Sequence, residues 1–205
     1  MTGRANGAGR AVLAAKAQWR SRLVASRLAV PGPERARRAA ALAASAVLLA
    51  GRTGGPVCAY LPVGTEPGSP ELVAALHAAG HEVLLPVVPP EPGPLDWARY
   101  TGPDGLAAGP LGLREPVGPR LGAAAVTSAR LVLVPALAAD RHGSRLGRGG
   151  GYYDRTLPLT APGTPLVVVL NDDELVDELP TEPHDRPVTA ALLADAGHTP
   201  LGNTG

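Results

Sequence analysis

The sequence contains a single cysteine, Cys58, so no disulfide can form within the chain. Cys58 lies in the apolar run 57–60, and we interpret it as a buried, inert thiol rather than a nucleophile. A lone cysteine excludes a disulfide scaffold and is typical of a reducing compartment. We therefore expect a cytoplasmic protein.

Excess charge and long apolar runs are also missing. The formal net charge is +1, from 19 basic and 18 acidic residues, so no strong basic field attracts nucleic acid or a membrane surface. The apolar stretch 39–50 is too short to span a bilayer, and residues 1–9 lack the apolar core of a signal peptide. We expect neither a nucleic-acid partner nor a membrane partner.

Phenylalanine is absent, and lysine occurs once among the 19 basic residues. Arginine occupies every other basic position, a bias typical of a GC-rich genome. The retained Lys16 stands out, because a compact ammonium group binds differently from a planar guanidinium. Either a site needs this ammonium group, or the lysine was retained by chance.

Helical periodicity marks the first part of the chain. The first predicted helix, 10–28, carries its apolar residues on roughly one side. These residues are Val12, Leu13, Ala15, Trp19, Leu23 and Val24. A second helix is predicted at 33–49, because a proline begins it and Gly51 ends it.

Near-continuous apolar runs then predict buried strands separated by helices. The strands are 57–63, 82–88, 131–137, 166–170 and 188–193, and the helices are 71–79, 152–157 and 172–179. This alternation is typical of a parallel sheet covered on both faces. We predict one α/β domain at 10–196, a three-layer α/β/α sandwich with a mostly parallel central sheet. Residues 1–9 are expected to be disordered and residues 197–205 to form a loose tail.

Residues 89–125 are dense in proline and glycine and show little periodicity. They contain a short strand candidate at 95–100 and an isolated segment at 113–116. Such an excursion is either functional or a variable surface loop, and both interpretations remain open. Trp97 and Tyr100 could stack on a ligand or pack in the core.

The segment 145–155 combines glycines, arginines, adjacent tyrosines and an aspartate, a mixture that no hydrophobic core requires. Glycine lets backbone amides approach an anion closely, and arginine binds phosphate oxygens in a planar fork. An aspartate could hold Mg²⁺ beside those phosphates. The segment is neither a Walker A loop nor a Rossmann fingerprint. It predicts a polyphosphate and metal site, and the alternative is a glycine-rich turn whose tyrosines pack on the sheet.

Residues 140–155, preceded by the apolar segment 134–137, closely resemble the signature of the 5-formyltetrahydrofolate cyclo-ligases. These enzymes are also called 5,10-methenyltetrahydrofolate synthetases. Their pattern, Gly-x-Arg-Leu-Gly-x-Gly-x-Gly-Tyr-Tyr-Asp, is met at every fixed position from Gly143 to Asp154. The resemblance extends from about Lys16 to Thr189, although some relatives carry lysine at the position of Gly150.

The resemblance implies a site built from four segments. ATP would be bound by Lys16, Arg20, Arg145, Leu146, Gly147, Arg148, Gly149, Gly150, Gly151, Tyr152 and Tyr153. The folate substrate would be bound by Glu66, Arg148, Gly149, Gly150, Gly151 and Tyr152. Mg²⁺ would be held by Asp154 and by Asp185, which follows His184. The residues expected to be catalytic are Arg148, Lys16 and Arg145.

From the residues alone, Lys16 and Arg20 could instead belong to a solvated basic face with Arg22 and Arg27, and Glu66 could be an ordinary turn residue.

The implied reaction is the ATP- and Mg²⁺-dependent closure of 5-formyltetrahydrofolate to 5,10-methenyltetrahydrofolate. The substrate would be a small molecule with or without a polyglutamate tail, and the protein a monomer. Two alternatives remain. One is an enzyme with the same ATP site that acts on another formyl or carboxyl compound, and the other is a non-catalytic nucleotide- or folate-binding module.

Overall fold

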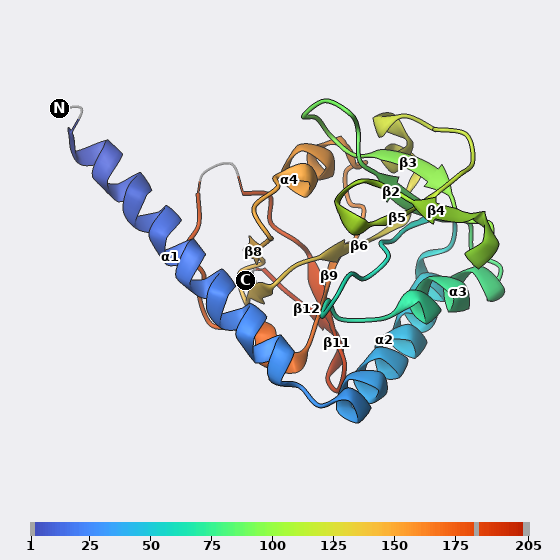
Figure 1. Cartoon of the computed structure of the whole chain (residues 1–205), viewed down its shortest axis with the longest axis horizontal. Coiled ribbons are helices and arrows are strands. Elements are labelled where there is room, and N and C mark those ends of the chain that lie inside the picture. Colours follow the sequence, from blue (N-terminus) through green and yellow to red (C-terminus); the bar gives the residue numbers. More distant parts are fainter. Residues whose placement is uncertain (1–2, 183–184, 203–205) are drawn as a thin grey trace.

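A computed structural model describes residues 3–182 and 185–202, and its centre is one large sheet (Figure 1). In spatial order its strands are β12 (Gly197–Pro200), β11 (Ala190–Leu193), β9 (Leu166–Leu170), β6 (Leu131–Pro135), β1 (Val57–Cys58), β2 (Val83–Val87) and β3 (Asp96–Arg99). All neighbouring pairs from β11 to β2 are parallel, whereas the edge strands β12 and β3 are antiparallel to their neighbours. The predicted mostly parallel sheet is confirmed.

The central strands bury both of their faces. Along β9, Val167 and Val169 join one core cluster, whereas Val168 and Leu170 join the cluster on the opposite face. This alternation follows from the two-residue repeat of a strand. A strand buried on both sides needs apolar residues at every position, which explains the continuous apolar runs of the sequence.

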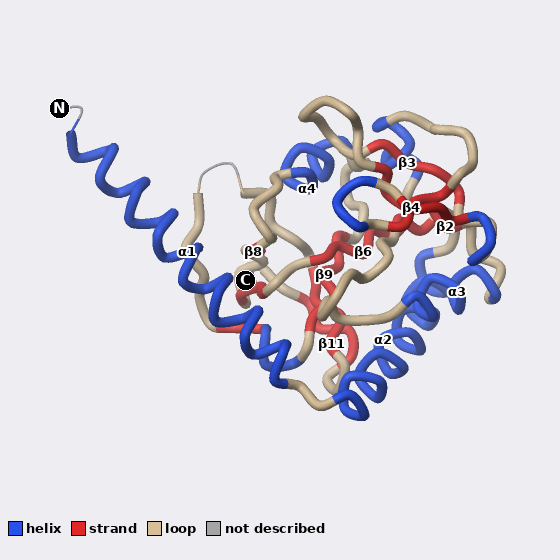
Figure 2. Tube along the Cα trace, in the orientation of Figure 1, coloured by secondary structure: helices blue, strands red, loops and turns tan. Residues whose placement is uncertain are grey.

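Helices cover the two faces unequally (Figure 2). The first cluster lies under α2 (Gly32–Thr53) and α3 (Pro70–Ala78). The second lies under shorter elements, η3 (Ala123–Ser128), α4 (Tyr152–Thr156) and η4 (Leu157–Leu159). The α/β fold with three layers is as predicted. No helix of the described residues is both long and apolar enough to cross a membrane.

Two small sheets lie beside the main one. β10 (Leu175–Val176), β7 (Ala138–Asp140) and β8 (Arg145–Leu146) form the first, and β4 (Leu106–Ala108) and β5 (Arg114–Pro116) form the second. The remaining short turns are η1 (Pro103–Gly105), η2 (Pro110–Gly112) and η5 (Asp172–Glu174). The β7–β8 hairpin leads directly into the glycine-rich segment, and the β4–β5 hairpin gives the excursion 89–125 its order.

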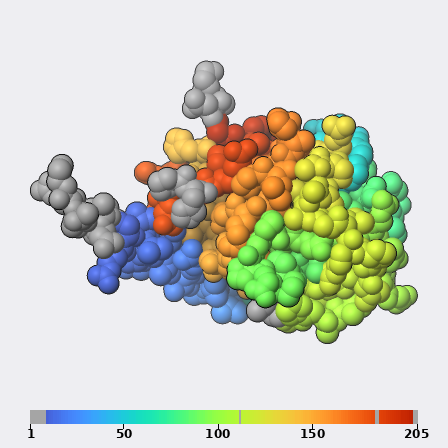
Figure 3. All heavy atoms as spheres, turned by 90° about the horizontal axis from the view of Figure 1, so that it is seen from above, coloured from blue at the N-terminus to red at the C-terminus, as the bar shows by residue number. Residues whose placement is uncertain are grey.

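The first helix, α1 (Gly3–Ala29), begins earlier than predicted, so residues 3–9, expected to be disordered, are helical. It lies along one side of the molecule, where Figure 3 shows it in blue. The predicted apolar side of this helix is wrong in part. Leu13 and Val24 are exposed, whereas Lys16, Leu23 and Arg27 are buried. The buried face of α1 is therefore partly cationic, and the ion pairs that it makes replace apolar packing.

Three further predictions differ from the structure. The expected strand 57–63 ends at Cys58, because Pro62 and Gly64 follow in a segment that leaves the sheet. The expected helix 172–179 is only η5, since Glu174 folds back to the Asn171 amide at 2.9 Å and β10 follows. The tail predicted to be loose contains β12, whose backbone pairs with β11 from Ala190 to Leu193.

Candidate functional site

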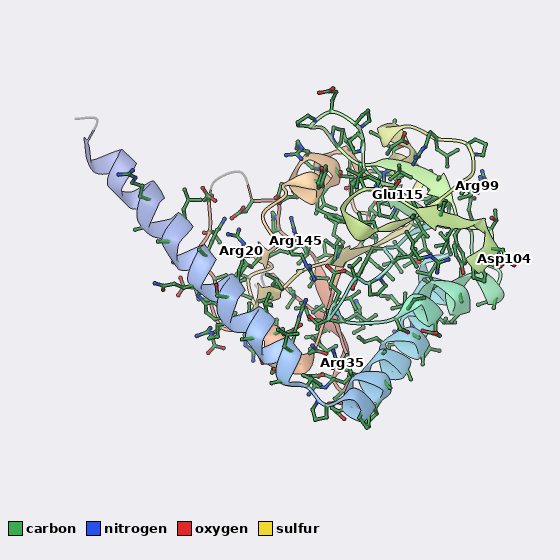
Figure 4. All side chains as sticks on the ribbon, in the orientation of Figure 1. Arg20, Arg35, Arg99, Asp104, Glu115 and Arg145 are labelled. Atoms are coloured by element: carbon green, nitrogen blue, oxygen red, sulfur yellow. The ribbon has the colours of Figure 1, made fainter. Side chains whose placement is uncertain are left out.

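One cavity of about 510 Å³ lies at the carboxyl ends of β1 and β6, between α1, the glycine-rich segment and the β4–β5 hairpin. Its size is within the range of small-molecule sites. The carboxyl ends of parallel strands are the usual place for such a site in an open α/β sheet. Figure 4 shows Arg20 on α1 and Arg145 on β8 extending toward this region from two separate elements.

The cavity collects every residue that the sequence assigned to the site. Its lining includes Lys16, Arg20, Glu66, Arg145, Leu146, Gly147, Arg148, Gly149, Gly150, Gly151, Tyr152, Tyr153, Asp154 and Asp185. The structure thus brings the four segments together. The role of each residue in binding or catalysis stays a prediction.

The glycine-rich segment follows a path that requires glycine at two positions. Gly149 and Gly151 have φ angles of 101° and 67°, in the region that side chains disfavour. At Gly151 a Cβ atom would also lie 2.8 Å from a terminal nitrogen of the Arg155 guanidinium. Arg20 donates from Nε to the Gly147 carbonyl oxygen at 3.0 Å. Helix α1 therefore holds the loop from outside, and this contact favours a site role for Arg20 over a solvated basic face.

Arg145 is buried at the base of the loop and forms an ion pair with Asp154 from α4. Its Nε atom is buried with no hydrogen-bond partner among the described residues. The guanidinium still lines the cavity, and a planar guanidinium is suited to phosphate oxygens.

Lys16 is also buried, and its Nζ donates to Asp185 Oδ2 and to Glu182 Oε2, each at 2.8 Å. Burial disfavours the ammonium form, but the hydrogen bonds and charges of Asp185 and Glu182 outweigh it and raise the pKa of Lys16. The lysine therefore stays charged. The sequence prediction missed Glu182, and the only available signal was an acid three residues before Asp185. His184 lies outside the described residues.

Glu66 and Arg148 meet at the opposite side of the loop, with 3.0 Å between Glu66 Oε1 and Arg148 Nε. The second oxygen of Glu66 accepts a hydrogen bond from the Val63 amide at 2.9 Å. Glu66 is thus fixed by its own turn and in turn orients Arg148. The ordinary-turn interpretation of Glu66 is incomplete, because the same carboxylate lines the cavity.

Several aromatic residues separate into two groups. Tyr152 and Tyr153 line the cavity, whereas Trp97 and Tyr100 pack in the two core clusters, so the core interpretation of that pair is correct. Burial raises the pKa of Tyr153, so its hydroxyl stays protonated. Burial likewise raises the pKa of Cys58, which is fully buried, as predicted. An inert thiol has no part in the site.

The carboxylates fit a magnesium site of modest size. Asp154 and Asp185 both line the cavity, and each has two oxygens, so one can accept a hydrogen bond from a cationic side chain while the other coordinates a metal. In the part of the chain that the structure describes, no three His, Cys, Asp or Glu residues form a metal-binding group. Mg²⁺ usually takes one or two carboxylates and completes its octahedron with phosphates and waters.

The protein has an open α/β sheet, with a glycine-rich loop and buried cations at the carboxyl ends of its strands. This arrangement places it in the class of α/β proteins that are suited to phosphorylated ligands. Comparison with known proteins narrows this class. The sequence profile of the 5-formyltetrahydrofolate cyclo-ligase family matches residues 12–194.

Individual relatives agree with the profile. The chain is 46% identical to a 5-formyltetrahydrofolate cyclo-ligase of Mycolicibacterium smegmatis, over 89% of this chain and 95% of the relative. It is 33% identical to the Escherichia coli enzyme of the same name, over 66% of this chain and 76% of the relative. The solved structure of Aquifex aeolicus 5,10-methenyltetrahydrofolate synthetase superposes with a TM-score of 0.74 at 26% identity, covering 93% and 94% of the two chains. The chain belongs to the 5-formyltetrahydrofolate cyclo-ligase family, and it is an enzyme of the ligase type.

Proposed function

We propose that this chain closes 5-formyltetrahydrofolate to 5,10-methenyltetrahydrofolate with ATP and Mg²⁺ and releases ADP and phosphate. The formyl oxygen takes the γ-phosphoryl group, which makes the formyl carbon electrophilic. Folate N10 attacks that carbon and loses its proton, and the oxygen departs with the phosphate. The formyl oxygen thus leaves as part of inorganic phosphate.

The observation that carries the proposal is the meeting of four distant segments on one cavity, with the buried cations Lys16 and Arg145 beside a glycine-rich loop. Phosphoryl transfer depends on positioning and on neutralising charge, rather than on a protein nucleophile. Lys16, Arg20, Arg145 and the loop amides would position the triphosphate. Arg148 would neutralise charge on the transferred group, and Glu66 would orient Arg148 and the folate.

Asp154 and Asp185 would hold Mg²⁺. When bound, the ion would neutralise charge on the triphosphate oxygens. Asp154 also keeps the buried Arg145 guanidinium in position, and Asp185 does the same for the Lys16 ammonium. Each carboxylate would thus serve both a metal and a phosphate-binding cation.

The test is the growth of near-ultraviolet absorbance of the methenyl product with ATP, Mg²⁺ and 5-formyltetrahydrofolate. Arg148→Ala should lower kcat by about a hundredfold or more, since a donor aimed at developing charge is lost. Arg141→Ala is the matched control, because Arg141 is exposed, lies close in sequence and is not part of the cavity lining. No signal from pure, folded wild-type protein would refute the proposal. Equal activity of Arg148→Ala and Arg141→Ala would refute the role of Arg148.

A monomeric state, a cytoplasmic location and a substrate with or without a polyglutamate tail belong to the same proposal. We also expect no nucleic-acid or membrane partner. The near-neutral charge supports the expectation of no nucleic-acid or membrane partner, and the lone buried cysteine supports the cytoplasmic location.

A further inference from the structure

The cavity has two ends of different chemistry. One end carries the glycine-rich loop, the buried cations and the carboxylates. The other end is mostly apolar and is lined by Leu85, Pro86, Val88, Leu95, Leu113 and Arg114. Three of these residues, Leu95, Leu113 and Arg114, come from the excursion 89–125. That excursion therefore forms a wall of the site and is not a surface loop throughout.

The wall is held in place by buried polar contacts. Glu115, a buried residue of β5, accepts from the Val88 amide at 2.8 Å and so attaches the β4–β5 hairpin to the end of β2. Gly109 leaves room for it, since a Cβ atom there would lie 2.8 Å from the Glu115 carboxyl carbon. The Leu95 amide donates to Thr156 Oγ1 at 2.8 Å. In Figure 4, Glu115 lies well away from Arg20 and Arg145.

Arg114 differs in its partners from three of the other four cations of the cavity, whereas Arg20 resembles it in donating to a carbonyl oxygen, that of Gly147. Lys16, Arg145 and Arg148 each form an ion pair with a carboxylate of the chain. Arg114 is exposed, and its guanidinium donates to the Pro103 carbonyl oxygen at 3.2 Å. No ion pair joins Arg114 to a carboxylate anywhere in residues 3–182 and 185–202. Its fork is available to a carboxylate of a ligand.

The substrate of the proposed function has a matching polarity. In 5-formyltetrahydrofolate the reacting formyl group and N10 lie on the pterin side of an apolar aminobenzoyl ring, and a glutamate with two carboxylates lies beyond that ring. The formyl oxygen must lie next to the γ-phosphate at the loop end. The ring and the glutamate therefore extend toward the other end of the cavity.

We propose that Arg114 binds a glutamate carboxylate of the folate, and that Leu113, Leu95 and Val88 hold the aminobenzoyl ring beside it. The inference rests on the proposed function and adds a specificity-determining residue to it. Arg114 acts far from the phosphoryl transfer. Its contribution depends on the glutamate of the substrate and not on ATP.

The test compares two substrates, 5-formyltetrahydrofolate and the 5-formyl derivative of tetrahydropteroate, which lacks the glutamate. For each protein, kcat/KM for 5-formyltetrahydrofolate is divided by kcat/KM for the derivative without glutamate. In Arg114→Gln this ratio should fall at least about tenfold, because a charge-assisted hydrogen bond is lost only with the glutamate-bearing substrate. Any loss of folded protein cancels in the ratio.

Arg99→Gln is the matched control, because Arg99 is exposed, pairs with Glu82 and is not part of the cavity lining. Its ratio should equal that of the wild type. An unchanged ratio in Arg114→Gln, or a selective rise in its KM for ATP, would overturn this inference alone. No turnover of either substrate by the wild-type protein would overturn the proposed function, and this inference with it.

Discussion

Lys16 is the only lysine of the sequence, and it is buried. Its compact ammonium group donates to two carboxylates, Asp185 and Glu182, from a buried position. A planar guanidinium needs more space and a different set of directions. The buried position and the two short hydrogen bonds fit a compact ammonium group, so the single lysine of the sequence is an informative residue.

Asp154 pairs with Arg145 and is also the proposed metal ligand, and variants at this residue should separate the two roles. Asp154→Ala removes a proposed metal ligand and also leaves the buried Arg145 without its carboxylate. We expect loss of turnover and a loss of stability of about 1–3 kcal/mol, measured by urea unfolding. Asp154→Asn retains an oxygen acceptor for Arg145, so it should lose turnover with a smaller loss of stability.

The control for these variants is Asp177→Ala, since Asp177 is almost fully exposed and pairs with Arg141 at a long 3.4 Å. Its stability should change by less than about 0.5 kcal/mol. Full activity of Asp154→Ala would show that the metal assignment is wrong.

At the scale of elements, α1 is the helix whose buried face is hardest to predict from the sequence. Its buried residues Lys16, Leu23 and Arg27 lie on one face, but two of the three are charged. Arg27 donates to both oxygens of the buried Glu174, at 2.6 and 2.8 Å, and to the Ala136 carbonyl oxygen at 2.7 Å. A pattern search for apolar residues finds Leu23 but misses Lys16 and Arg27, because the partners that allow these charges to be buried come from distant segments.

Leu23 is the apolar anchor of α1, packed with Leu137, Ala138, Leu146 and Leu179. Leu23→Ala should loosen the helix, because a buried leucine truncated to alanine costs about 2–5 kcal/mol. Backbone hydrogen exchange of α1 should accelerate, and KM for ATP should rise, since Lys16 and Arg20 lie on the same helix. Leu28→Ala is the control of the same chemistry, because Leu28 is 66% exposed. Equal exchange rates in the two variants would contradict the anchoring role.

The other elements show where sequence patterns suffice. Strand β9 matches its predicted bounds, 166–170, because a short apolar run with three consecutive valines favours a buried strand over a helix. β12 was missed, since its four residues pair with β11 through backbone groups and show no apolar signal. η5 was predicted as a longer helix because periodicity cannot reveal that Glu174 bonds to Asn171 and Arg27.

At the scale of the whole molecule, the sequence predicted which residues line one cavity but not how they pair with one another. Adjacent glycines and tyrosines carried the family signature, so the loop was recognisable from local sequence. The pairing of Arg148 with Glu66, or of Lys16 with Glu182, joins positions far apart in the chain. Only the folded sheet and α1 bring such positions together. For the same reason Arg114, in the least regular part of the sequence, gave no signal.

A site assembled from distant segments should stabilise the whole fold when it is filled. At about 100 times its Kd, a non-hydrolysable ATP analogue with Mg²⁺ should add about 2.7 kcal/mol to the free energy of unfolding. For a chain of this length that corresponds to a rise in Tm of about 5–10 °C. The rise should be smaller when EDTA replaces Mg²⁺, because Asp154 and Asp185 would then face the triphosphate without a metal between them. Scanning calorimetry at fixed protein concentration measures both shifts, and an equal rise with and without Mg²⁺ would exclude these two carboxylates as its ligands.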